Sequence, residues 1–267
     1  METKDLYIIK MGGSAITDKS KHKFVRYDVI DGCARAIKKS LNEKKFDLII
    51  VHGGGSFGHP IASRYELHEG LLHESSWIGF SETIDSMREL NMEVTRIFRS
   101  KGLPVIPLQP SAFMVTRAGK IQKEVNLKVI RLAINRGFIP ILWGDAVLDE
   151  CKGCAILSGD EIILYLGRVL RPNKIIFGTD VDGIYQDVKN RKGLIRRITK
   201  ENYQKIISVL RPVEYSDVTG GIIAKVKVMA KLANMGIKVY LINILKPENL
   251  YAAILDHEVM GTIFDFA

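Results

Sequence analysis

Short apolar runs alternate with longer amphipathic stretches along most of the chain. The runs are rich in Ile, Val and Leu and lie at 6–11, 46–52, 104–108, 138–144, 174–179 and 238–243. Their nearly continuous hydrophobicity indicates strands buried on both faces, which is typical of a mostly parallel sheet between helical layers. The stretches between them predict helices at 27–43, 76–100, 125–136, 159–169, 200–210, 220–235 and 247–256. The pattern therefore predicts an α/β fold, a three-layer αβα sandwich with a mostly parallel central sheet.

The segment 142–161 departs from this pattern, because two short apolar runs flank the polar turn 149–153. This arrangement predicts a β-hairpin at an edge. The turn brings in Cys151 and Cys154 as a C-x-x-C pair. A zinc site would need two further ligands at similar spacing, and a redox pair would need a strand-to-helix junction. We interpret the pair as two thiols of the hairpin turn, and the residues alone leave a redox role open.

The chain has 267 residues, of which 46% are hydrophobic, and this is enough to form one large domain over 1–267 without a linker. We see no internal repeat or low-complexity tract. No apolar run is long enough to span a membrane, and the first residues lack the pattern of a signal peptide. We therefore expect a cytoplasmic protein with no membrane partner.

The net charge of +9 does not identify a ligand by itself. Basic residues cluster at 19–23 and 189–200, but neither cluster interleaves aromatic residues on which bases could stack. We therefore expect no nucleic acid as a partner. A solvated surface and the attraction of phosphate groups both explain the excess charge.

Two of the expected strands end in glycine clusters, IIKMGGS at 8–14 and IIVHGGGSFGH at 49–59. Ligands bind at the carboxyl ends of strands in open parallel sheets, and glycine lets backbone amides approach an anion closely. Two such loops on neighbouring strands could hold two phosphates that face each other. Neither loop is a Walker A or a dinucleotide-binding motif.

These loops belong to a set of motifs that resembles the isopentenyl phosphate kinase family of the amino acid kinase superfamily. The resemblance runs from residue 6 to 262 and rests on K-x-G-G-S (10–14), H-G-G-G-S-F-G-H (52–59), Q-P-S-A-F (109–113), G-D (144–145), S-G-D (158–160), T-D-V-D-G-I-Y (179–185) and D-V-T-G-G (217–221) followed by Lys225. It implies ATP-dependent phosphorylation of isopentenyl phosphate, with Mg2+ carried by the nucleotide, and it suggests a homodimer. The acceptor then binds to the half 1–170 and the nucleotide to the half 171–267.

Three lysines are candidate catalytic residues, because transfer between two phosphates needs positive charge where negative charge builds up. Lys10 precedes the first glycine loop and should point at the oxygens between donor and acceptor. The resemblance implies that Lys19 contacts the transferring phosphoryl group and that Lys225 acts on the ATP side. Alternatives are a surface loop lysine for Lys19 and a helix-surface lysine for Lys225.

His59 separates kinases of phosphate or phosphonate acceptors from those members of the superfamily that act on carboxylates, which lack it by resemblance. Its imidazole N–H can donate to an oxygen of a phosphate or phosphonate. Asp160 lies at an expected helix N-terminus, where a plain capping carboxylate is the alternative. The resemblance implies that Asp160 instead holds the catalytic lysines in place and that the amide of Gly159 binds the acceptor phosphate.

The remaining candidate residues form three groups. The nucleotide group, together with Lys10 and Lys225, contains Gly12, Gly13, Ser14, Gly55, Thr179, Asp180, Gly220 and Gly221. Asp180 and its neighbour Asp182 line the nucleotide pocket by resemblance, and their spacing alone does not make them metal ligands. We expect Gly54 and Gly58, besides His59 and Gly159, to bind the acceptor phosphate. The apolar tail of the acceptor should contact Phe80, Ile84, Met87 and Phe113, although the helical spacing of the first three equally describes core packing.

Three other functions remain open from the residues alone. Fosfomycin kinase has a similar histidine, so a phosphonate is an alternative acceptor. A nucleotide-sensing domain on this fold would be expected to lose Lys10 or Lys225, and both are present. Nucleic-acid binding is the weakest alternative.

Overall fold

A sheet of eight strands lies at the centre of the fold. The computed structural model describes residues 4–122, 125–214 and 221–266. The strand order is β14 (Arg197–Ile198), β16 (Gly261–Phe264), β15 (Lys238–Asn243), β11 (Lys174–Thr179), β1 (Leu6–Met11), β4 (Asp47–His52), β8 (Ile139–Trp143), β5 (Val105–Pro107). The six strands from β15 to β5 are parallel, whereas β16 runs antiparallel to β15. The prediction of a mostly parallel sheet is confirmed.

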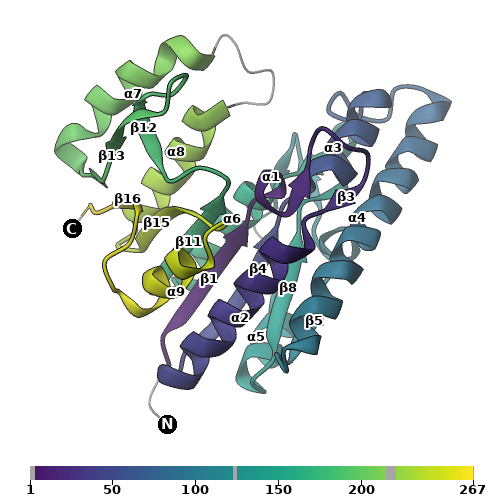
Figure 1. Ribbon diagram of the computed structural model, residues 1–267. Coiled ribbons are helices and arrows are strands. Elements are labelled where there is room, and N and C mark those ends of the chain that lie inside the picture. Colours follow the sequence, from purple (N-terminus) through teal and green to yellow (C-terminus); the bar gives the residue numbers. More distant parts are fainter. Residues whose placement is uncertain (1–3, 123–124, 215–220, 267) are drawn as a thin grey trace.

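Helices cover both faces of this sheet (Figure 1). One face packs against α2 (Tyr27–Glu43), α4 (Glu74–Ser100) and α9 (Pro247–Leu255), and the other against α5 (Lys128–Asn135), α6 (Gly159–Leu170) and α8 (Gly221–Ala233). On β1, Ile9 belongs to the first core and Ile8 to the second, and both are fully buried. Burial on both faces explains the continuous apolar runs and confirms the three layers. The helix α7 (Lys200–Glu214) packs on α8.

A smaller sheet contains the expected hairpin. It has the order β10 (Gly153–Leu157), β9 (Asp145–Asp149), β6 (Thr116–Arg117), β7 (Lys120–Ile121), so β10 forms an edge as predicted. Cys151 is exposed in the turn and Cys154 is buried on β10, and both thiols are free. Two more hairpins pair β12 (Ile184–Asp187) with β13 (Lys192–Ile195) and β2 (Thr17–Asp18) with β3 (Phe24–Val25).

Three helical elements were not expected from the sequence: α1 (Gly13–Ile16), α3 (Gly55–Arg64) and the 3-10 turn η1 (Pro110–Ala112). The short strands β2, β3, β6, β7, β12, β13, β14 and β16 were not expected either. Gly54 caps α3, and the helix itself contains Gly55, Gly58 and Pro60. Such a composition is typical of a loop. Two expected helices begin later, because α5 starts at Lys128 and α8 starts at Gly221. Residue 220, the expected first residue of α8, lies outside the described part of the chain.

The sheet divides between the two halves of the chain. Residues up to 170 supply β1, β4, β8 and β5, and residues from 171 supply β11, β15, β16 and β14. Figure 1 shows these halves as two lobes with β1 and β11 side by side between them. None of the helices in the described ranges is both long and apolar enough to cross a membrane.

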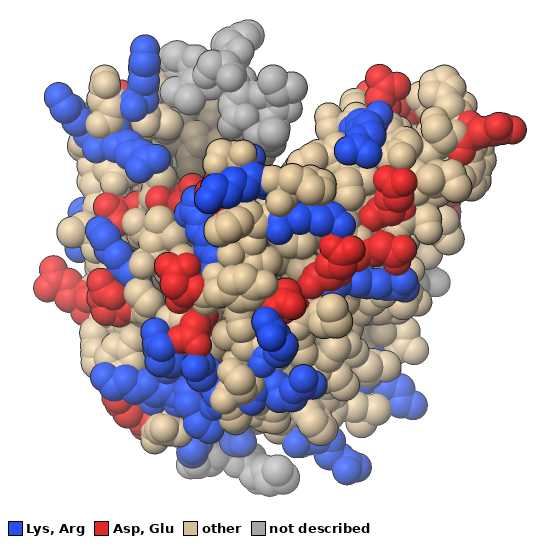
Figure 2. All heavy atoms as spheres, turned by 45° about the vertical axis from the view of Figure 1, so that its right-hand side comes forward, with Lys and Arg blue, Asp and Glu red and all other residues tan. Residues whose placement is uncertain are grey.

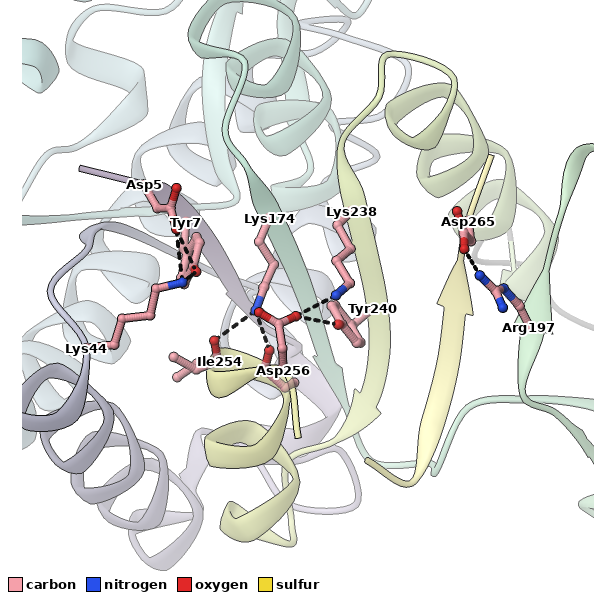
Figure 3. Close-up of polar contacts among 11 residues, drawn as sticks. Asp5, Tyr7, Lys44, Lys174, Arg197, Lys238, Tyr240, Ile254, Asp256 and Asp265 are labelled. Atoms are coloured by element: carbon pink, nitrogen blue, oxygen red, sulfur yellow. Dashed lines mark hydrogen bonds and ion pairs between the residues drawn. The ribbon is translucent and has the colours of Figure 1, made fainter. Parts of the chain in front are cut away.

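Ionic side chains gather at the amino-terminal ends of the strands (Figure 3). Lys174 begins β11 and is 2% exposed, and its ammonium group donates to the carbonyls of Ala253 and Ile254 at 2.8 Å each and to Asp256 at 2.9 Å. Asp256 also accepts from Lys238 at 2.6 Å. The cluster therefore fastens the end of α9 to the start of β11 and β15.

Candidate active site

The two glycine loops meet at the carboxyl ends of β1 and β4. A side chain at Gly13 would place its Cβ 2.4 Å from the amide nitrogen of Gly55, and one at Gly53 would lie 2.7 Å from the nitrogen of Gly13. Both distances are far below van der Waals contact, so only glycine allows the backbones to come together. Gly55 also has a positive φ of 49°, a conformation that glycine adopts without strain.

The side chain of Thr17 joins these loops. Its hydroxyl donates to the carbonyl of Gly13 at 2.7 Å and accepts from the amide of Ser56 at 3.0 Å. Thr17 is fully buried, so this hydroxyl has little competition from water. Thr17 was not predicted from the sequence, because a threonine that follows a glycine loop has no distinctive spacing.

Lys10, Asp160 and Lys225 come together beside the loops. The ammonium of Lys10, at the end of β1, lies 2.6 Å from one carboxylate oxygen of Asp160, and the ammonium of Lys225 lies 3.2 Å from the other. Asp160 is the second residue of α6, whose N-cap Ser158 accepts from the amide of Glu161. Lys225 is the fifth residue of α8. The predicted contact of Asp160 with both lysines is present.

Burial sets the protonation of this cluster. It lowers the pKa of Lys10 to about 8, although Asp160 favours the charged form. Burial alone would raise the pKa of Asp160, but the charges and hydrogen bonds of Lys10 and Lys225 outweigh it and lower that pKa to about 2. Asp160 is therefore a carboxylate at neutral pH, and one carboxylate balances two ammonium groups. The excess positive charge suits an anionic ligand.

His59 lies near the same cluster, in the middle of α3. Its side chain reaches the surface, but the protein around it still removes part of its hydration. This desolvation, together with the charges of Lys19 and Lys10, lowers the pKa of His59 below the usual value. His59 is therefore mostly neutral at pH 7 and can donate one N–H. Lys19 is exposed on the loop after β2, and its charge acts on His59. The structure thus brings His59, Lys19 and Lys10 to one place.

The candidate nucleotide residues lie on the side of β11. Ser14 donates to a carboxylate oxygen of Asp180 at 3.0 Å, and the hydroxyl of Thr179 donates to the same oxygen at 3.1 Å. Gly12 donates its amide to the carbonyl of Gly178 at 2.8 Å. The first glycine loop is thus joined to the end of β11. Gly220 lies outside the described residues, and Gly221 begins α8.

Asp182 is engaged by protein groups rather than open to a cation. Its carboxylate accepts from Asn243 at 3.0 Å and from Lys246 at 3.1 Å. In the described ranges, no group of three or more His, Cys, Asp or Glu residues could hold a metal ion.

The four residues assigned to the acceptor tail differ in burial. Met87 is 1% exposed, and a Cβ at Gly54 or Gly58 would lie within 3.0 Å of its sulfur, so Met87 packs directly against the second loop. Phe80 is half-buried and packs against a small cluster with Leu67 and Cys154. The other two, Ile84 on α4 and Phe113 after η1, are also half-buried.

Two buried polar residues near the loops were not singled out from the sequence. Asp145 is 2% exposed and accepts from the amide of Ser111 at 3.2 Å, so it holds η1 in place. Burial raises the pKa of Asp145 to about 6. His52, at the end of β4, is fully buried and bonds to Asn91 of α4. Asp145 and His52 both belong to motifs that were noted, G-D and H-G-G-G-S, but only contacts in space show what they hold.

Figure 2 shows a hollow between the two lobes, with Lys and Arg side chains beside it. Glycine-loop amides, three ammonium groups and one carboxylate meet at the strand ends that the lobes share. Such a surface suits two phosphate groups brought close together. The fold and this surface define the class of phosphotransferases that bind nucleotides through glycine loops other than the Walker A.

Comparison with known proteins agrees with this class. The model of the amino acid kinase family matches residues 5–243. The chain is 35% identical to isopentenyl phosphate kinase of Methanocaldococcus jannaschii over 98% of this chain and 99% of that one, and 33% identical to the enzyme of the same name from Methanothermobacter thermautotrophicus over 96% and 98%. A solved structure of isopentenyl phosphate kinase superposes with a TM-score of 0.82 at 30% identity, over 97% and 99% of the two chains. The chain belongs to the amino acid kinase family and, within it, to the isopentenyl phosphate kinases.

Proposed function

We propose that this chain transfers the γ-phosphoryl group of ATP to isopentenyl phosphate, giving ADP and isopentenyl diphosphate. The reaction joins an oxygen of the acceptor phosphate to the γ-phosphorus and breaks the bond from that phosphorus to the oxygen that leaves with ADP. The observation that carries the proposal is the cluster in which Lys10 and Lys225 share Asp160 beside two touching glycine loops. Similarity to relatives named isopentenyl phosphate kinase supports this acceptor.

The charged groups divide the work between donor and acceptor. Lys10 stabilises the charge on the oxygens between the two phosphates, and Asp160 keeps its ammonium in place. Lys225 and the amides of α8 bind the nucleotide phosphates, and Lys19 contacts the transferring group. Magnesium, carried by the nucleotide, adds further positive charge at its phosphates.

His59 binds and orients the acceptor phosphate. A phosphate monoester is already ionised near neutral pH, so the acceptor oxygen needs little help from a general base. The lowered pKa of His59 leaves the ring able to donate one hydrogen bond without protonation. The amides of Gly54 and Gly159 complete the acceptor site in this proposal, whereas the amide of Gly58 donates to the carbonyl of Gly54 at 3.3 Å, so Gly58 serves only by letting the chain pass close to the phosphate.

The nucleotide occupies the other side of the first loop. We assign to it Gly12, Gly13, Ser14 and Gly55, together with Thr179, Asp180, Gly220 and Gly221 in the half 171–267. The bond from Ser14 to Asp180 supports this assignment, because it joins the first loop to the end of β11. The acceptor residues all lie in the half 1–170.

The isoprenoid tail extends toward α4 and η1. Phe80, Ile84 and Phe113 are half-buried apolar side chains on these elements and could contact a short hydrocarbon tail. Met87 lies beneath the second loop and limits the space there.

A panel of acceptors tests the proposal. The purified chain is given ATP and Mg2+ with isopentenyl phosphate, dimethylallyl phosphate, geranyl phosphate, fosfomycin, acetylglutamate or UMP, and ADP formation is measured. We expect the highest kcat/KM with isopentenyl phosphate. A preference for fosfomycin would contradict isopentenyl phosphate as the acceptor but would still agree with a phosphotransferase. No turnover with any acceptor would contradict the proposed kinase activity itself.

The homodimer is a separate proposal based on family membership. Light scattering coupled to size-exclusion chromatography should give twice the chain mass of 30.0 kDa. A mass of one chain at micromolar concentration would contradict it.

A further inference from the structure

His52 is a buried histidine that the proposed reaction does not use. It ends β4 directly before the second glycine loop and is fully buried. Its ring stacks with Trp143 of β8 at a centroid distance of 6.0 Å, within an apolar core that includes Met87. A polar ring in such a place is costly unless both of its nitrogens are hydrogen-bonded.

Both nitrogens have partners. Nδ1 lies 3.1 Å from the carbonyl oxygen of Gly53, and Nε2 lies 3.1 Å from the amide nitrogen of Asn91. The oxygen of the same Asn91 side chain lies 3.3 Å from the hydroxyl of Thr95, which donates to it in this orientation of the amide.

These partners define one tautomer. A carbonyl can only accept, so Nδ1 of His52 carries the proton, and Nε2 accepts from Asn91. Protonation of Nε2 would set two donors against each other. In agreement with this, burial lowers the pKa of His52 to about 4. The ring is therefore neutral at physiological pH and always donates to Gly53.

This hydrogen bond fixes a peptide plane of the second loop. In a trans peptide the carbonyl and the following N–H point in opposite directions. When His52 holds the Gly53 carbonyl toward the core, the N–H of Gly54 points away from it. In the described part of the chain, the amides of Gly54 and Gly55 have no hydrogen-bond partner.

The backbone of His52 also reaches the other side of the site. Its carbonyl accepts from the amide of Gly144 at 3.0 Å, and a Cβ at Gly159 would lie 3.4 Å from that carbonyl. His52 thus lies between the second glycine loop and the start of α6, which carries Asp160.

We propose that His52, supported by Asn91, is a positioning residue that holds the Gly53–Gly54 peptide so that the Gly54 amide faces the acceptor phosphate. The inference rests on the proposed function, in which the second loop binds that phosphate. It predicts an effect on the acceptor rather than on ATP. His52 itself touches neither substrate.

Two substitutions of similar polarity separate the two nitrogens of the ring. His52→Asn places an amide nitrogen where Nδ1 lies and keeps the donor to Gly53, whereas His52→Gln places its amide nearer to Nε2 and keeps only the contact with Asn91. We expect His52→Gln to raise the KM for isopentenyl phosphate at least about tenfold, the cost of roughly one hydrogen bond, with the KM for ATP within about twofold. His52→Asn should stay within about threefold of the wild type for both substrates.

Equal effects of the two variants, a larger effect of His52→Asn, or a parallel rise in the KM for ATP would overturn the inference. Melting temperatures are measured alongside, because a purely structural role would lower them in both variants without separating the two KM values. Ring 15N shifts of the wild type give a readout that needs no turnover. We expect an Nδ1–H tautomer from pH 5 to pH 8, and an Nε2–H tautomer would also overturn the inference.

These outcomes differ from failure of the proposed function. If the wild type does not use isopentenyl phosphate, the proposed function fails at once, while the tautomer still tests the hydrogen bond to Gly53. The variants are then compared with the acceptor that the wild type prefers.

Discussion

Two clusters, each of two lysines and one aspartate, lie at opposite ends of the strands of the central sheet. At the carboxyl ends of the strands, Asp160 bridges Lys10 and Lys225. At the amino-terminal ends, Asp256 bridges Lys174 and Lys238 (Figure 3). In each pair one lysine begins or ends a central strand and is more than nine-tenths buried.

The clusters differ in how many donors are used. Lys174 donates to two carbonyls at the end of α9 and to Asp256, so all three of its N–H groups have partners. Lys10 has a hydrogen bond only to Asp160 in the described part of the chain, and its ring contact with Phe177 is distant at 6.0 Å. A buried ammonium with unused donors is costly unless something else binds there. Unused hydrogen-bond donors, rather than buried charge, therefore distinguish the cluster that we propose to be catalytic from the structural one.

The largest expected effect concerns Lys10. Lys10→Met should lower kcat at least about a hundredfold with a modest change in either KM, because its charge matters most while the phosphoryl group transfers. Steady-state kinetics with both substrates measure this. A kcat near that of the wild type would show that the open donors of Lys10 have no role in the reaction.

Lys174→Met should do the reverse. It removes three hydrogen bonds and leaves two carbonyls without their donor, while Asp256 keeps its bond from Lys238, so we expect a loss of about 2 to 3 kcal/mol in the free energy of unfolding. Urea titration measures this loss, and kcat of the folded enzyme at 25 °C should stay within about twofold. A normal stability together with reduced kcat would contradict the structural assignment of this cluster.

His59 tests whether groups around the carboxyl-end cluster share its role. His59→Ala should raise the KM for isopentenyl phosphate about tenfold or more and leave the KM for ATP nearly unchanged, since a hydrogen bond to a charged group contributes about 1.5–3 kcal/mol. His257, which lies after α9 beside the amino-terminal cluster, offers a matched control. His257→Ala should change neither KM, and an equal effect of the two variants would refute the prediction.

The last prediction concerns the pH dependence of the reaction and of stability. Lys10 has a pKa of about 8 against its usual 10.5, so kcat/KM should fall about tenfold per pH unit above pH 8 as its ammonium loses the proton. Stability should change in the opposite direction. Between about pH 8 and 10.5 the unfolded chain binds more protons at Lys10 than the folded one, so the contribution of Lys10 to stability rises with pH. Flat kcat/KM up to pH 10 would contradict the low pKa.

The sequence predicted the central sheet well, because its buried strands are continuous apolar runs. It also placed Lys10 and Asp160 at the site, through motifs that stand at the ends of strands and the start of a helix. It did not predict α3, because glycines and Pro60 mask a helix whose first residues must approach another loop. Local composition cannot show that the other loop supplies this constraint.

The residues that hold the two glycine loops and the strand ends in place could not be predicted from the sequence for a related reason. His52 and Asn91 are separated by 39 residues, and Lys174 and Asp256 by more than 80, so only the packing of the helices on the sheet brings each pair together. Lys174 begins an apolar run and by pattern alone would be a solvated lysine at a strand end. Its burial follows from the return of α9 across the sheet.

The position of β1 has a consequence for the order of synthesis. Of the eight strands of this sheet, β1 is made first, and it lies in the middle of the finished sheet, between β4 and β11. Its partner β4 ends at residue 52, but β11 is not complete until residue 179. At about 5–20 residues per second, the backbone edge of β1 that later pairs with β11 stays unpaired for on the order of ten seconds. During that interval one edge of β1 in the nascent chain has no partner strand and could pair with a strand of another chain.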